Sequence, residues 1–248
     1  IKKQQFIMIF KKVYSSSLLK DYNYCITDYN EYKNYEKCAI LRHDVDNSLY
    51  DAVKLAKIEY DNNVKSTYFI LLSTDFYNIF SKNSRKLINE VISLGHHIGL
   101  HFDEVKYDDI NNKDSLKKYV YKEIEIMSRE LEVDINVVSM HRPSKWVLEE
   151  NIVFDNNIVN TYGKEFFENF KYVSDSRMHW REDVIGTIKS SNYQKIHILT
   201  HAFWYNKENE LPKSKFNRFL FNRNMEMYEA LKSNVRDLDE FITKKDIM

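Results

Sequence analysis

Short apolar runs alternate along the chain with longer segments in which apolar residues recur at helical spacing. The runs predict buried strands, and the longer segments predict amphipathic helices that pack against them. Alternation of strand and helix is typical of an α/β protein with a parallel sheet and crossover helices. We expect strands over 38–44, 67–72, 97–102, 133–140, 158–162, 171–174 and 196–200, and helices over 82–94, 113–132 and 214–245.

The domain organisation expected from this pattern is simple. Residues 1–35, rich in Tyr and Lys, predict a short helical lead-in. Residues 36–248 predict a single domain, because no repeat, low-complexity segment or linker interrupts them. A chain of 248 residues with 43% hydrophobic residues is large enough to bury a substantial core.

Charge and cysteine content exclude some classes of function. Lys+Arg 37 balance Asp+Glu 37 and no basic stripe stands out, so we expect no nucleic-acid partner. No apolar run approaches the ~20 residues that span a bilayer. Cys25 and Cys38 are too few for a disulfide framework and are expected to be reduced thiols. These features predict a cytoplasmic protein, working in the cytosol or at the inner face of the membrane.

Polar side chains suited to metal binding or proton transfer follow the predicted strands directly. In α/β barrels and open parallel sheets, the carboxyl ends of the strands meet at one edge, where the chemistry takes place. We therefore expect one site built from the residues at these ends: Asp44, Asp46, His101, Asp103, His141, Arg142, Asp175 and His201.

Asp44 and Asp46 end the first of these strands, two residues apart. If the strand continues through them, they share one face with Arg42 and lie about 6–7 Å apart along it. Such a pair can divide the work of a metal-assisted hydrolase, one carboxylate holding the metal and the other accepting a proton. The alternative is a solvated loop in which Asp46 caps the next helix.

Three histidines, His96, His97 and His101, belong to the strand expected over 97–102 and the residue before it. On a strand, His97, Gly99 and His101 alternate onto one face, where Gly99 would leave room for a ligand or a close backbone. His101 is nearest the strand end and is the best metal candidate. His96 and His97 are expected to be structural or to support the ligands from behind.

His141 and Arg142 close the fourth expected strand. Arg142 could pair with Asp44 and keep it ionised, because a nearby cation lowers the pKa of a carboxylate. The alternative is that Arg142 makes a structural salt bridge. His141 is either a metal ligand or a packed side chain.

The last two expected strands end near Asp175 and His201, and a tryptophan follows each of them. Asp175 and Trp180 could orient a catalytic histidine and wall a sugar pocket; the alternative is a turn with a surface tryptophan. His201 suits a general acid, and Trp204 lies in an aromatic group suited to stacking on a sugar. An ordinary aromatic cluster is the alternative there.

Taken in order, the motifs LRHDVD, TYFIL, GHHIGLHF, MHRP, YVSDSRMHW and ILTHAFWY resemble those of the polysaccharide deacetylases of the NodB-homology, carbohydrate esterase family 4 type. They more closely resemble the divergent branch of bacterial capsule and lipopolysaccharide gene clusters. The resemblance covers roughly residues 36–205. It implies a distorted, TIM-like (β/α) barrel of about seven strands. It also implies a divalent metal, commonly zinc, that serves to remove acetyl from N-acetylated sugars.

The resemblance assigns a role to each matching residue and leaves one position unmatched. The usual second metal histidine would fall at Val105, so His141 is our replacement candidate, with Asp103 second. The glutamate of the family's common GHEIG motif is replaced by His97 here. The matching roles are the base (Asp44), the metal aspartate (Asp46), the first metal histidine (His101), the arginine motif that steadies the base (Arg142 with Pro143), the support of the acid and wall of the pocket (Asp175 and Trp180) and the general acid (His201).

These expectations combine into a metal-dependent hydrolase that removes an N-acyl group from a sugar during surface-polysaccharide synthesis. The partner is then an N-acylated sugar or glycan, and zinc is the default metal from the ligand types. One alternative is a glycan-binding protein on a degenerate deacetylase fold, which the valine at position 105 favours. Another is a deformylase of a lipid-linked sugar, which uses the same chemistry on a smaller acyl group.

Overall fold

A computed structural model describes residues 17–155, 157–176, 180–205 and 211–247. The chain forms two compact units, Ile1–Tyr205 and Asn206–Met248. The lead-in predicted over residues 1–35 falls partly outside the described residues. Its described part holds a short helix, α2 (Ser17–Asp21), a 3-10 turn, η1 (Tyr32–Asn34), and a strand that the helical prediction did not include. The domain boundaries drawn from the sequence stay predictions.

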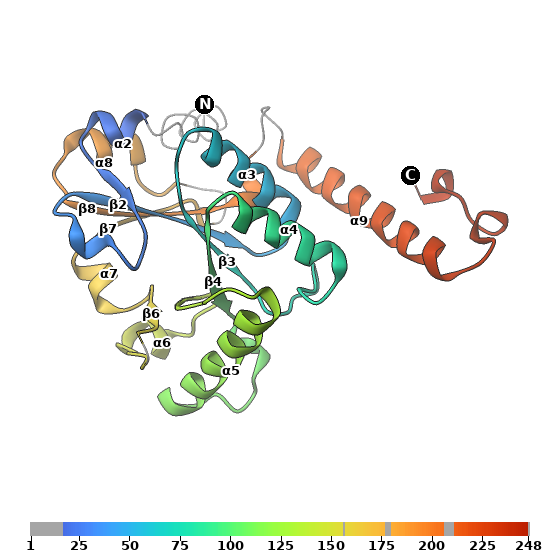
Figure 1. Ribbon diagram of the computed structural model, residues 1–248, viewed down its shortest axis with the longest axis horizontal. Helices are drawn as coiled ribbons and strands as arrows, with labels where there is room; N and C mark the ends of the chain where they lie inside the picture. Colours follow the sequence, from blue (N-terminus) through green and yellow to red (C-terminus); the bar gives the residue numbers. More distant parts are fainter. Residues whose placement is uncertain (1–16, 156, 177–179, 206–210, 248) are drawn as a thin grey trace. The chain divides into compact units, whose positions relative to one another are not determined.

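The first unit is built on an eight-stranded sheet in which every pairing of strands is parallel. Seven strands follow one path in the order β6-β5-β4-β3-β2-β8-β7, and β1 pairs with the start of β2 (Figure 1). The predicted α/β class is therefore confirmed. The strands are β1 (Cys25–Thr27), β2 (Cys38–Val45), β3 (Thr67–Ile70), β4 (His97–Phe102), β5 (Val137–Met140), β6 (Val159–Asn160), β7 (Lys171–Ser174) and β8 (Lys195–His201).

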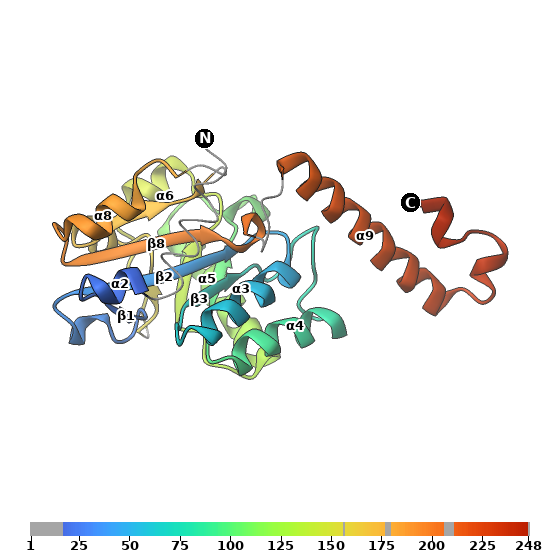
Figure 2. The ribbon, with the colours of Figure 1, turned by 90° about the horizontal axis from the view of Figure 1, so that it is seen from above.

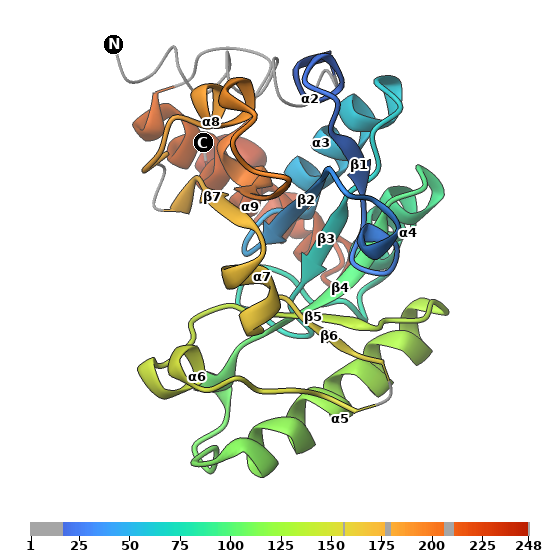
Figure 3. The same ribbon diagram turned by 90° about the vertical axis from the view of Figure 1, so that its left-hand side faces the viewer.

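The sheet curls into an open barrel. The evidence is a side chain that reaches across the barrel interior. Arg42 on β2 donates hydrogen bonds to Ser139 on β5 and to Thr161 just after β6. In a flat sheet β5 would lie three strands, or about 14 Å, from β2, beyond the reach of an arginine. The curl is visible in Figure 3. The predicted distorted barrel is confirmed, with a gap between the terminal strands β6 and β7, which share no pairing among the described residues.

Helices cover the outer face of this sheet, and their apolar sides form the main core with the outward strand residues (Figure 2). Ser48 caps α3 by accepting a hydrogen bond from the backbone N–H of Asp51, as expected for a helix that starts there. Asn112 and Ser115 form a capping box at the start of α5. The helices are α3 (Leu49–Asp61), α4 (Lys82–Ser93), α5 (Lys113–Leu131), α6 (Lys145–Glu149) and α8 (Val184–Ser190). A further helix, α7 (Lys164–Glu168), packs instead against the inner face through Phe166.

The inner face of the barrel has its own smaller aromatic core. Gly99 is needed there because a Cβ at this position would lie 2.5 Å from the ring of Phe69. The space that the glycine leaves is therefore filled by Phe69 rather than by a ligand. The ring in turn packs against the Arg42 guanidinium, 5.0 Å from the ring centre. The inner core comprises Tyr29, Tyr32, Cys38, Ile40, Phe69, Val137, Phe166 and Phe170.

Three strands are shorter than the sequence predicted. The strand expected over 67–72 ends at Ile70, after which the backbone N–H of Leu71 donates to the Tyr77 hydroxyl. The strand expected over 133–140 begins only at Val137, because the backbone N–H of Ile135 donates to the hydroxyl of Ser128 in the last turn of α5. The strand expected over 158–162 is reduced to Val159–Asn160, because Asn160 accepts the backbone N–H of Tyr162 and turns the chain. Apolar runs alone do not show such side-chain-to-backbone bonds.

The second unit is a helix with a short returning tail. The helix, α9 (Pro212–Asn234), has a proline in its first turn and ends before Val235, whose backbone is extended. The helix expected up to residue 245 is thus shorter than predicted. Asp239 accepts hydrogen bonds from Tyr228 and Lys232, which holds the tail, with its 3-10 turns Leu238–Glu240 and Lys244–Ile247, against the helix. Among the described residues no helix is long and apolar enough to cross a membrane.

Candidate active site

The polar residues predicted at the strand ends come together at the carboxyl edge of the barrel. Asp44 is the register partner of His201 across β2 and β8. The Asp44 carboxylate lies 3.6 Å from Nε2 of His101, and Asp46 lies 3.8 Å from Nε2 of His201. His141 directly follows β5 and points at the same place, 3.1 Å from His101. The structure thus brings these five side chains together, whereas Asp103 and Arg142 pair with each other outside the cluster.

Three side chains in this site are arranged as metal ligands would be. Ligand atoms of Asp46, His101 and His141 all lie within 4.8 Å of one another. Oδ1 of Asp46 is 3.3 Å from Nε2 of His101 and 3.4 Å from Nδ1 of His141. A tetrahedral ion with ligands at 2.0–2.1 Å requires ligand atoms about 3.3 Å apart. The three observed separations, 3.1, 3.3 and 3.4 Å, are close to that value.

The surroundings of these atoms also fit a cation. Oδ1 of Asp46 is buried and accepts no well-aligned hydrogen bond, although two ring nitrogens are near it. A buried carboxylate oxygen in that state is costly unless a cation compensates it. His101 directs its other nitrogen, Nδ1, toward the backbone carbonyl of Ser139 at 3.4 Å. Metal-binding histidines usually make such a bond, which leaves the second nitrogen free for the ion.

Asp44 is held by an arginine from its own strand. Arg42 donates to both carboxylate oxygens, from Nε at 2.8 Å and from Nη2 at 2.7 Å, with both side chains buried. The guanidinium lies between the rings of Phe69 and Tyr162. Burial alone would raise the pKa of Asp44, but the Arg42 charge lowers it below its ordinary value. The carboxylate is therefore ionised at neutral pH, and its orientation is fixed at two points.

The predicted pairing of Arg142 with Asp44 is wrong. Arg142 pairs with Asp103 instead, through Nε at 3.2 Å and through Nη2, and its side chain is 58% exposed. His141 points into the site and is 20% exposed, whereas the neighbouring Arg142 side chain lies at the surface. The structural salt bridge that was the alternative for Arg142 is what forms. Arg42 fills the place that Arg142 was expected to take.

His201 is oriented by Asp175, as the sequence predicted. Nδ1 of His201 is 2.6 Å from Oδ1 of Asp175, and the backbone N–H of His201 donates to the same carboxylate. Tyr205 donates its hydroxyl to the other oxygen at 2.8 Å. Burial opposes a charge on His201, but Asp175 and the carboxylates of the site outweigh it and raise the pKa of His201 to about 9. The ring is therefore a proton donor at neutral pH.

The two tryptophans predicted to contact a sugar differ in accessibility. Trp180 is 9% exposed and belongs to the main core, so it offers little surface for stacking. Trp204 is partly buried and packs against Phe203, with ring centres 4.8 Å apart. Trp204 is the better placed of the two to contact a ligand.

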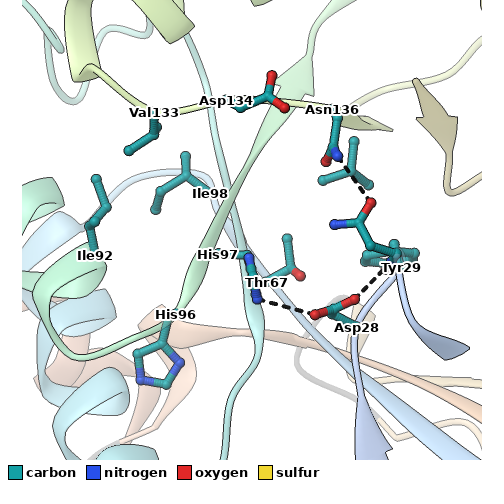
Figure 4. A pocket seen from close by; sticks show the side chains of 12 residues that line it. Asp28, Tyr29, Thr67, Ile92, His96, His97, Ile98, Val133, Asp134 and Asn136 are labelled. Atoms are coloured by element: carbon teal, nitrogen blue, oxygen red, sulfur yellow. Dashed lines mark hydrogen bonds and ion pairs between the residues drawn. The ribbon is translucent and has the colours of Figure 1, made fainter. Parts of the chain in front are cut away.

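The remaining candidate ligands lie outside the cluster. Asp103 is engaged by Arg142, whereas His141 belongs to the cluster. Val105 is 60% exposed in the 3-10 turn η2 (Glu104–Lys106). His96 and His97 lie at the start of β4, at the opposite end of the barrel, where they line a cavity of about 330 Å³ (Figure 4). His97 pairs there with Asp28 at 3.2 Å. Neither histidine belongs to the cluster of Asp46, His101 and His141.

Sequence reasoning missed Arg42, Ser139 and Tyr205 as parts of the site. A signal existed for Arg42, because it stands two residues before Asp44 on the same strand face. No comparable signal marks Ser139 and Tyr205, because their contacts depend on the curl of the sheet and on the turn after β8.

No protein-family model and no curated protein matches the chain. Among solved structures, it is similar to a family 4 acetyl xylan esterase from Clostridium thermocellum in complex with a cobalt ion, at 14% identity and a TM-score of 0.41, over 75% of this chain and 84% of that one. It is also similar to a family 4 carbohydrate esterase from Streptomyces lividans in complex with acetate (10% identity, 73% and 83% of the two chains, TM-score 0.46). A CE4 family pseudoenzyme from Bacillus anthracis matches with 12% identity, 75% and 61% of the two chains and a TM-score of 0.43. These proteins carry the name of the family that the motifs resemble.

Proposed function

We propose that the protein is a metal-dependent hydrolase that removes an N-acyl group, acetyl by default, from a sugar in surface-polysaccharide synthesis. The observation that carries the proposal is the cluster of Asp46, His101 and His141, beside which lie Asp44, held by Arg42, and His201, held by Asp175. A site with a cation-binding cluster, a base and an acid has the parts that hydrolysis of an amide requires.

Asp46, His101 and His141 would hold a divalent ion, zinc being the default for two imidazoles and a carboxylate. When bound, such an ion polarises an acyl carbonyl and lowers the pKa of water in the site toward about 7. Asp44 needs that help, because the charge of Arg42 makes it a weak base. Fixed by Arg42 at both oxygens, Asp44 then accepts the proton of the attacking water without turning away.

His201 would complete the reaction by donating a proton to the leaving amine. Asp175 holds the ring through Nδ1, so Nε2 is the atom that faces the site and carries the proton. An amine leaves poorly unless it is protonated, so this transfer is as important as the attack of water. The two proton-transferring groups belong to neighbouring strands, β2 and β8, where they are register partners, and they lie 3.6 Å and 3.8 Å from members of the cluster.

The test is acyl release from a panel of N-acetylated and N-formylated amino-sugar oligosaccharides by the full chain. We expect acetate release that stops after treatment with a chelator and returns when zinc or cobalt is added. His97→Gln, which changes a histidine at the far end of the barrel, should behave as the unchanged protein. Release that persists after complete metal removal would contradict the proposal, and a preference for formate would favour the deformylase.

A second candidate is a glycan-binding protein without catalysis, favoured by the valine where the resemblance expects a metal histidine. The same panel separates the two functions. Binding of an oligosaccharide by metal-loaded protein, with neither acetate nor formate released, would support the second candidate.

A further inference from the structure

A buried polar cluster lies on the outer face of the sheet, on the side opposite to the candidate active site. Its centre is Glu59 of α3, a carboxylate with no exposed surface inside an otherwise apolar layer. A buried carboxylate is very costly unless it is fully hydrogen-bonded. Around it lie four polar side chains that are themselves at most 1% exposed: His43, Ser66, Tyr68 and Thr200.

Each oxygen of the Glu59 carboxylate has partners. Oε1 is 2.7 Å from Nε2 of His43, and Oε2 accepts hydrogen bonds from Ser66 at 2.6 Å and Tyr68 at 2.8 Å. Burial alone would raise the pKa of Glu59, but His43 lowers it. The carboxylate is thus ionised and can only accept hydrogen bonds, so Nε2 of His43 donates to it.

The other ring nitrogen of His43 extends this series of hydrogen bonds to a second strand. Nδ1 lies 2.6 Å from the Thr200 hydroxyl, and the two residues are register partners across β2 and β8. The next pair in that register is Asp44 with His201. Neighbouring residues on a strand face opposite sides of the sheet. The His43–Thr200 link therefore lies directly behind Asp44 and His201, the base and the acid of the proposed reaction. The link also ties both strands to α3, which begins just after Asp46.

We propose that Glu59, acting through this hydrogen-bonded chain, is a positioning residue that holds Asp44 and His201 at their working separation. The inference rests on the proposed function, because it assigns a purpose to that separation. The hydrogen-bonded link from Glu59 to Thr200 contacts neither the substrate nor the metal-ligand cluster. It acts by fixing β8 against β2 through side chains at the last pair of the ladder before Asp44 and His201.

The link can be cut without touching the carboxylate. Thr200→Val removes the hydroxyl, keeps the shape and leaves every bond of Glu59 in place. Thr200→Ser keeps the hydroxyl and serves as the rescue. Tyr68→Phe is the matched control, because it removes one hydrogen bond from the same carboxylate without affecting β8.

We expect Thr200→Val to lower kcat for acyl release by about ten- to a hundred-fold, the range typical of misplaced reacting groups. KM and zinc affinity should change less than about twofold, since neither is set by the separation of base and acid. Thr200→Ser should restore kcat, and Tyr68→Phe should retain it despite a comparable loss of thermal stability. A kcat for Thr200→Val equal to that of Tyr68→Phe would overturn the inference.

A structural readout separates this inference from the proposed function. Crystal structures of the two variants should show the His201 ring displaced from Asp44 in Thr200→Val and unmoved in Tyr68→Phe. If the unchanged protein releases no acyl group at all, the proposed function fails. The position of the His201 ring in Thr200→Val still shows whether the hydrogen-bonded link positions Asp44 and His201. An unmoved His201 in Thr200→Val would overturn the positioning role whatever the activity.

Discussion

Replacing Asp44 with asparagine is expected to lower acyl release by about 10²- to 10⁴-fold, the usual contribution of a general base. Asparagine has nearly the same shape but cannot accept a proton from water. The Asp46, His101 and His141 cluster does not include residue 44, so zinc binding should persist. The measurement is kcat for acetate release, with bound zinc determined on the same sample.

Folding has to be checked in the same variant, because a neutral amide at position 44 would leave the buried Arg42 charge only partly compensated. Circular dichroism and retained zinc binding report an intact fold. Undiminished turnover in a folded, zinc-loaded Asp44→Asn protein would exclude Asp44 as the base.

Replacing Arg42 with methionine is expected to cost about 3–5 kcal/mol of the free energy of unfolding, the usual result of leaving a buried charge unpaired. Arg42 and Asp44 are 1% and 4% exposed, so water cannot replace the lost partner. The variant also loses the bonds to Ser139 and Thr161, which connect β2 across the barrel interior. Urea denaturation measures the change, and activity should fall with it because Asp44 is no longer held.

Arg142→Met is the matched control for Arg42→Met. Its side chain is 58% exposed and its pair with Asp103 is open to solvent, so the expected cost is about 0–1 kcal/mol. A large loss of activity in Arg142→Met, with little change in Arg42→Met, would restore the role that the sequence suggested for Arg142.

Much of the site could be predicted from the sequence, because the positions of metal-ligand residues at strand ends follow from the parallel topology alone. His101 and His141 are far apart in the chain, yet each follows or ends a strand, and the carboxyl edge brings them together. The pairing of His201 with Asp175 follows in the same way from the adjacent strands β7 and β8.

What the sequence could not supply is the direction of side chains beyond the strands and the contacts across the barrel. Arg142 lies only one residue after a candidate ligand, and a single turn of the backbone sends it to Asp103. No sequence pattern marks Glu59 as buried, because its surroundings depend on how α3 packs on the sheet. Chain order and periodicity do not contain that information.

The most direct test of the proposed metal centre is a zinc titration of the metal-free full chain, followed by calorimetry, for the unchanged protein and for His141→Ala. We predict one ion per chain and an affinity lowered by more than about 100-fold in His141→Ala, because a lost ligand costs more than a lost supporting contact. Asp103→Asn, the alternative ligand, should bind as the unchanged protein does. Equal affinity in His141→Ala, or a loss confined to Asp103→Asn, would contradict the cluster of Asp46, His101 and His141 as the metal centre.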